Sequence, residues 1–100
     1  MNFGLPQDII ESLRREIQKE ENVTRVVIFG SRARGDYSFN SDIDLAIYSE
    51  GKLPPELLQD LEEAAGIYKI DVIDMNTSPD EKIRRRIEKQ GVEFYHRNFK

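Results

Sequence analysis

The chain of 100 residues carries a formal net charge of −4, and 38% of its residues are hydrophobic. This length and apolar content suit one domain with a modest core, so we predict a single domain over residues 1–100. The absence of cysteine excludes disulfides and thiolate metal sites. The acidic balance argues against direct nucleic-acid binding, which normally needs a basic face. Without a long apolar run or a signal-peptide pattern, we expect a cytoplasmic protein.

The first part of the chain predicts a helix, a buried strand and a short helix. Between residues 8 and 20, four aliphatic residues recur at helical spacing: Ile9, Ile10, Leu13 and Ile17. A run of β-branched and aromatic residues over 23–29 then stops at Gly30, as in a strand that ends in a tight turn. Residues 31–35 are sufficient for one or two helical turns.

The turn at Gly30-Ser31 has the chemistry of a phosphate site. A strand that enters a helix through these residues leaves backbone N–H groups and a hydroxyl near the positive end of the helix. Arg32 and Arg34 add guanidinium groups, which pair well with phosphate oxygens. We therefore predict that Gly30, Ser31, Arg32 and Arg34 bind nucleotide phosphates.

A pair of carboxylates follows in the next predicted strand, residues 41–48. Because successive strand side chains point to opposite faces, Asp42 and Asp44 share one face, about 7 Å apart, and the aliphatic residues take the other. Two such carboxylates repel each other unless a cation lies between them. Mg²⁺, which prefers carboxylate and phosphate oxygens, is the expected ion.

The second half predicts a helix and a third strand. Pro54-Pro55 begins the helix and Gly66 ends it. Its predicted buried stripe consists of Leu57, Leu58, Leu61, Ala64 and Ala65. Residues 68–75 then form a strand in which Asp71 and Asp74 point to opposite faces, so at most one of them can join the carboxylate pair. We predict that Asp71, which lies within the strand, is the third acid, and that Asp74 is a turn or capping residue.

A last helix and a short strand complete the predicted elements. Residues 78–81 read as a capping box, with Pro79 as the first helical residue. The helix packs Ile83 and Ile87 and ends before Gly91, and residues 92–95 follow as a strand. Three consecutive arginines at 84–86 point in different directions on this helix, which favours a solvated basic face.

The spacing Gly30-Ser31, ten residues, Asp42-Ile43-Asp44 and then a strand-borne aspartate resembles the nucleotidyltransferase fold related to DNA polymerase β. The form GSRARG…SDIDLAI is similar to the minimal nucleotidyltransferase (MNT) family over essentially the whole chain. The resemblance implies an α/β (α+β) fold, a small mixed sheet of three to four strands with helices packed against it. It also implies that Asp42, Asp44 and Asp71 are the catalytic residues and bind two Mg²⁺ ions, with ATP as substrate.

The same resemblance implies an activity and a partner. The expected reaction moves AMP from ATP to a hydroxyl group and releases pyrophosphate. The usual partner in this family is a HEPN-domain toxin, and the acceptor is a tyrosine of that toxin, so the chain is expected to be an antitoxin in a hetero-oligomer. Two alternatives remain open: a non-catalytic subunit that neutralises its partner sterically, and a small-molecule nucleotidyltransferase completed by a helical partner subunit.

Overall fold

The computed structural model of the chain describes residues 2–77 and 79–98. Its centre is a four-stranded sheet in the order β3-β2-β1-β4. The strands are β1 (Val23–Phe29), β2 (Ile43–Ser49), β3 (Ile70–Asp74) and β4 (Val92–His96). β1 is antiparallel to both β2 and β4, whereas β2 and β3 are parallel. This mixed sheet with helices confirms the predicted fold class.

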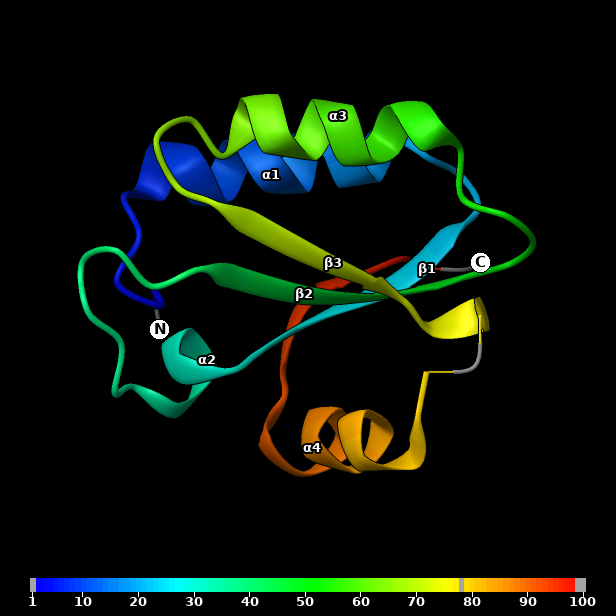
Figure 1. The fold of residues 1–100 in the computed structure, drawn as a ribbon. Coiled ribbons are helices and arrows are strands. Elements are labelled where there is room, and N and C mark those ends of the chain that lie inside the picture. The colour runs from blue at the N-terminus through cyan, green and yellow to red at the C-terminus, as the bar shows by residue number, and fades with distance from the viewer. Residues whose placement is uncertain (1, 78, 99–100) are drawn as a thin grey trace.

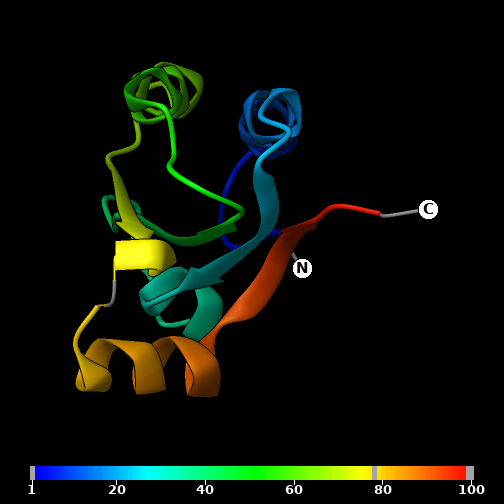
Figure 2. The same ribbon diagram turned by 90° about the vertical axis from the view of Figure 1, so that its right-hand side faces the viewer.

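The helices lie on both faces of the sheet. They are α1 (Gln7–Lys19), α2 (Ser31–Arg34), α3 (Pro55–Ala64) and α4 (Glu81–Gln90), with a 3₁₀ turn, η1, at Met75–Thr77. α1 and α3 run side by side over one face, and α4 lies against the opposite face (Figures 1 and 2). The short α2 follows directly on the end of β1 (Figure 1).

The main core lies between the sheet and the α1–α3 pair. Its fully buried aliphatic residues come from α1, α3 and alternate positions of β1 and β2: Leu13, Ile17, Leu61, Val26, Ile28, Ile43, Leu45 and Ile47. The predicted alternation of β2 is therefore confirmed, because its aliphatic residues face α1 and α3. The other face of the sheet carries a smaller apolar cluster under α4 that includes Val27, Ala46, Ile73 and Ile87.

Two predicted details are wrong. Leu58 is 46% exposed and does not belong to the buried stripe of α3. α4 begins at Glu81 rather than at Pro79, because the Asp80 carboxylate accepts a hydrogen bond from the Ile83 N–H (3.0 Å) and so acts as the N-cap. Ser78, the predicted cap, lies outside the described residues.

The contrast between Leu61 and Leu58 predicts the stability of two variants of α3. Leu61→Ala opens a cavity in the main core and should lower the free energy of unfolding by about 2–5 kcal/mol. Leu58→Ala changes an exposed position of the same helix and should stay within about 0.5 kcal/mol of the wild type. Urea unfolding of both variants measures this difference, and equal losses would contradict the assigned orientation of α3.

Candidate functional site

The sheet register aligns the acidic residues across neighbouring strands. Asp44 of β2 pairs with Asp71 of β3, and on its other side it pairs with Phe29, the last residue of β1. Residues directly opposite each other share a face of the sheet. Asp42, two positions before Asp44, completes a cluster in which each carboxylate offers one oxygen within 4.8 Å of the others. The structure thus brings together the three acids that the sequence predicted.

Gly30 allows the turn after β1 to approach Asp44. Its φ of +75° lies in a region that side chains other than glycine rarely adopt. A Cβ at this position would also overlap the Asp44 carboxylate oxygen. Both constraints require glycine, and they hold the start of α2, with Ser31, beside the acidic cluster.

A cavity of about 490 Å³ opens at this point between the sheet, α2 and α4. Its polar wall includes Gly30, Ser31, Arg34, Asp44, Asp71 and Arg86. Three apolar residues, Phe29, Ile73 and Ile83, line the rest. The cavity therefore combines carboxylates from the sheet with guanidinium groups from α2 and α4.

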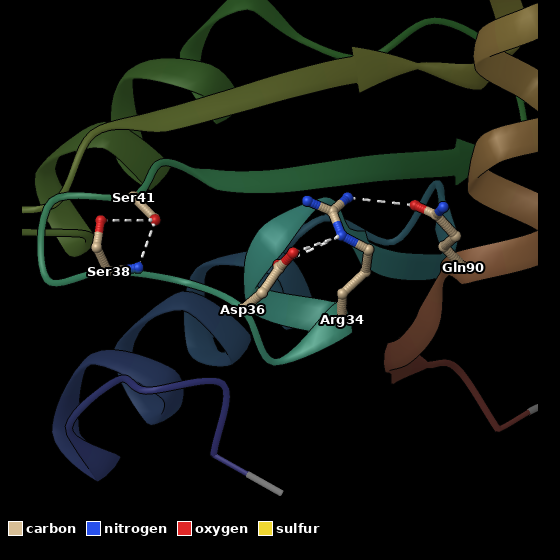
Figure 3. Close-up of polar contacts among 5 residues, drawn as sticks. All are labelled: Arg34, Asp36, Ser38, Ser41 and Gln90. Atoms are coloured by element: carbon tan, nitrogen blue, oxygen red, sulfur yellow. Dashed lines mark hydrogen bonds and ion pairs between the residues drawn. The ribbon is translucent and has the colours of Figure 1, made fainter.

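Arg34 is held at the edge of the cavity by contacts on both sides. Its Nη1 donates a hydrogen bond to Oε1 of Gln90 on α4 (3.3 Å), and its Nε lies 3.3 Å from the Asp36 carboxylate (Figure 3). A second contact in the same region, from the Ser38 N–H to the Ser41 hydroxyl (2.9 Å), closes the loop before β2 (Figure 3). Arg34 is thus positioned jointly by α4 and by the loop after α2.

The surroundings of Asp44 disfavour ionisation of its carboxyl group. Burial raises its pKa, and the neighbouring charges of Asp71 and Asp42 raise the pKa further, whereas Arg34 lowers it. The site therefore concentrates negative charge at a partly buried position. Such an arrangement is relieved by a bound cation or by a proton.

Arg32 does not reach the cavity, so the structure gives it another role than the predicted phosphate contact. Its side chain is 1% exposed, and its guanidinium donates hydrogen bonds to the carbonyl oxygens of Phe3 (3.0 Å) and Ser41 (2.9 Å). The same group stacks on the rings of Tyr37 and Tyr68. The reason is helical geometry, because side chains two residues apart on a helix are rotated by about 200° from each other. Arg32 and Arg34 therefore point in opposite directions.

The aromatic residues of the loop before β2 also lie outside the large cavity. Tyr37 packs on Arg32, and Phe39, which is 77% exposed, contacts the ring of Tyr68. A second cavity of about 190 Å³ has Phe39, Tyr68 and Asp42 in its wall. The exposed side of Asp42 therefore adjoins an aromatic surface.

Comparisons with known proteins identify the family. The sequence model of the family described as "Polymerase beta, Nucleotidyltransferase" matches residues 11–100. The chain belongs to this nucleotidyltransferase family. A curated relative in Methanocaldococcus jannaschii, named "Putative protein adenylyltransferase", is 27% identical over 92 residues, which cover 86% of this chain and 91% of the relative.

Solved structures show the same fold. A crystal structure of a toxin–antitoxin with AMP-PNP contains a chain that is 26% identical, with a TM-score of 0.72 over 93% of this chain and 75% of that chain. The MNT antitoxin complex of a tri-AMPylated Shewanella oneidensis HEPN toxin contains a chain that is 19% identical, with a TM-score of 0.67, and it covers 89% of this chain and 71% of that chain. The resemblance to minimal nucleotidyltransferases is thereby confirmed.

The remaining charged residues that the sequence analysis singled out in this nucleotidyltransferase are Asp74 and the arginines of α4. Asp74 accepts a hydrogen bond from the Asn76 N–H (2.9 Å) at the start of η1, which confirms its interpretation as a turn residue. Arg85 pairs with Glu81 in solvent and Arg86 is exposed, as predicted for a solvated face, but Arg86 also lines the cavity. None of the helices in the described residues is long and apolar enough to span a membrane.

The raised pKa of Asp44 predicts how the metal-free protein responds to pH. The folded state binds this proton more tightly than the unfolded state, so stability should fall as the pH rises from the ordinary carboxyl pKa of 3.8 through the raised pKa. Asp44→Asn should therefore unfold at a higher temperature than the wild type at pH 7. Calorimetry resolves this change, since 1 kcal/mol shifts the Tm of such a domain by roughly 4–8 °C.

The same calorimetric experiment at pH 3 provides the control. There Asp44 is protonated in the folded and in the unfolded state of the wild type, so the difference between the two proteins should shrink. An Asp44→Asn variant that is no more stable than the wild type at pH 7 would contradict the electrostatic account of the site.

Proposed function

We propose that this nucleotidyltransferase transfers AMP from ATP to a tyrosine hydroxyl of a HEPN-domain partner, and that the modification makes it an antitoxin in a hetero-oligomer. The observation that carries the proposal is the placement of Asp42, Asp44 and Asp71 beside Gly30-Ser31 at one cavity. The relative named for protein adenylylation supports a protein as the acceptor, and the toxin–antitoxin structure with AMP-PNP supports an adenine nucleotide and a toxin partner. Because the reaction uses ATP, we place it in the cytoplasm.

The three carboxylates suit a hard divalent cation. Their oxygens lie close enough to be shared ligands. Burial and the neighbouring charges of Asp71 and Asp42 raise the pKa of Asp44, and a cation would offset that unfavourable charge. We propose that Asp42, Asp44 and Asp71 hold two Mg²⁺ ions. When bound, Mg²⁺ would supply charge neutralisation at the α-phosphate and lower the pKa of the attacking hydroxyl.

The rest of the cavity fits the nucleotide's triphosphate. Ser31 offers a hydroxyl, Gly30 brings the backbone close, and Arg34 offers a guanidinium that Gln90 and Asp36 hold in place. Pre-positioned groups of this kind stabilise developing charge on phosphate oxygens without moving at the moment of reaction. Triphosphate binding is thus assigned to α2 and its flanking turn.

The chemical step is a displacement at the α-phosphorus. The tyrosine oxygen forms a bond to this phosphorus, and the bond to the α,β-bridging oxygen breaks, so that pyrophosphate leaves with the electron pair. The hydroxyl proton passes to a carboxylate and then to water. Asp71 suits this role because it is exposed and belongs to the carboxylate cluster. The protein therefore contributes position and charge rather than a covalent intermediate.

Intact-mass measurement of a co-expressed HEPN-domain partner tests the proposal. Incubation with this protein, Mg²⁺ and ATP should add one or more AMP units to the partner, and substitution of phenylalanine for the modified tyrosine should abolish the gain. Asp44→Asn, which keeps the fold, should reduce the modification by at least a hundredfold, as expected when a group that stabilises the transition state is removed.

Two other outcomes would contradict adenylylation of the partner. A stable complex without any mass gain would favour a purely steric antitoxin, and the acidic cluster would then have no chemical role. Consumption of ATP with a modified small molecule and an unmodified partner would favour a small-molecule transferase that a helical subunit completes.

A further inference from the structure

We propose that Arg86 of α4 and Arg34 of α2 form a subsite for the terminal phosphates of the nucleotide, and so for the departing pyrophosphate. The inference rests on the proposed function and assigns a binding role to a residue that the sequence pattern left on a solvated face. The ligand class is a di- or triphosphate anion.

α4 places Arg86 at the cavity from a fixed base. The next residue, Ile87, is 1% exposed and packs into the apolar cluster beneath α4. After the helix ends, a Cβ at Gly91 would overlap both Val27 of β1 and the Ile87 carbonyl oxygen, so the backbone lies directly against the sheet. The C-terminal half of α4 is therefore firmly seated, and Arg86 extends from it into the cavity wall.

The same face of α4 also positions Arg34. Arg86 and Gln90 are four residues apart, which makes them neighbours on the helix surface. The Gln90 side chain accepts a hydrogen bond from Arg34 (3.3 Å; Figure 3). Arg34 therefore lies beside the face of α4 that carries Arg86. One helix thus brings two guanidinium groups to one side of the cavity.

The charges of the cavity are separated by element. The sheet contributes Asp44 and Asp71, whereas α2 and α4 contribute Arg34 and Arg86. In residues 2–77 and 79–98 the Arg86 side chain makes no ion pair, while its neighbour Arg85 pairs with Glu81 (3.3 Å). Two guanidinium groups in one cavity wall repel each other unless an anion lies between them.

A nucleoside triphosphate fits both the carboxylates of the sheet and the guanidinium groups of α2 and α4. Its α-phosphate belongs at the carboxylates, where transfer takes place, so the β- and γ-phosphates extend to another part of the cavity. Guanidinium groups are well suited to these phosphate oxygens because they offer several N–H donors in a fixed plane. Arg86 should therefore sense whether the terminal phosphates are present and should contribute nothing to binding of AMP.

Calorimetric titration with three probes in the presence of Mg²⁺ tests this subsite: AMP-PNP, inorganic tripolyphosphate and AMP. Arg86→Gln should weaken AMP-PNP and tripolyphosphate about tenfold or more, as expected for a lost charge-assisted contact, and should leave AMP unchanged. Arg86→Lys keeps the charge without the planar donor group and should recover part of the loss. The matched control is Arg85→Gln, which removes the same charge one residue away, at an exposed side chain that is not part of the cavity wall.

The possible outcomes separate this inference from the proposed function. If the wild type binds AMP-PNP and Arg86→Gln binds it equally well, the subsite is overturned and the proposed function stands. The subsite is also overturned if Arg85→Gln weakens AMP-PNP binding as much as Arg86→Gln does, because the effect then comes from the overall charge of the protein. It is likewise overturned if Arg86→Gln weakens AMP and AMP-PNP binding equally, because the effect then comes from a change in the fold. A wild type that binds neither AMP-PNP nor tripolyphosphate overturns the subsite together with the proposed function.

Discussion

The position of the Asp44 carboxylate is the constraint on which the rest of the site depends. Asp71 lies opposite it on β3, and Gly30 approaches it so closely that no side chain fits between them. Sheet register therefore fixes the distance between the acidic cluster and the turn that begins α2. A shift of β2 by one residue would turn Asp44 into the main core and expose its aliphatic neighbours, so the same hydrophobic pattern that stabilises the sheet also specifies the site.

The fold separates stability from chemistry by using the two faces of the sheet differently. α1 and α3 cover one face with a continuous aliphatic core, while α4 covers only part of the other and leaves the cavity open. The unfavourable charge at Asp44 is thus placed where burial is incomplete. Arg32 stabilises the loop before β2, because its buried guanidinium donates hydrogen bonds to the carbonyl oxygens of both Ser41, next to Asp42, and Phe3 in the N-terminal turn. A loop held in this way presents its carboxylate with little loss of entropy on binding.

Much of this arrangement could be predicted from local pattern. Strand alternation separates Asp42 and Asp44 from the aliphatic residues Ile43, Leu45 and Ile47, and odd spacing separates Asp71 from Asp74. These predictions hold in the folded protein because each depends on the geometry of a single strand. Other features could not be predicted with the same ease, because they depend on which elements meet. Leu58 fits a buried stripe by spacing but finds no partner, and Arg86 acquires its place only when α4 packs across the sheet. Helical geometry alone does predict that Arg32 and Arg34, two residues apart, point in opposite directions and do not face the same ligand.

The most direct test of the account compares metal binding by two aspartates of one strand. Titration with Mn²⁺, monitored by the electron paramagnetic resonance of the free ion, measures the affinity of the wild type, Asp71→Asn and Asp74→Asn. Asp71 belongs to the carboxylate cluster, whereas Asp74 caps η1 away from it. Asp71→Asn should bind Mn²⁺ much more weakly than the wild type, and Asp74→Asn should bind it like the wild type. Equal affinities of the wild type and Asp71→Asn, or a larger loss in Asp74→Asn, would contradict the assignment of the three carboxylates as the metal site.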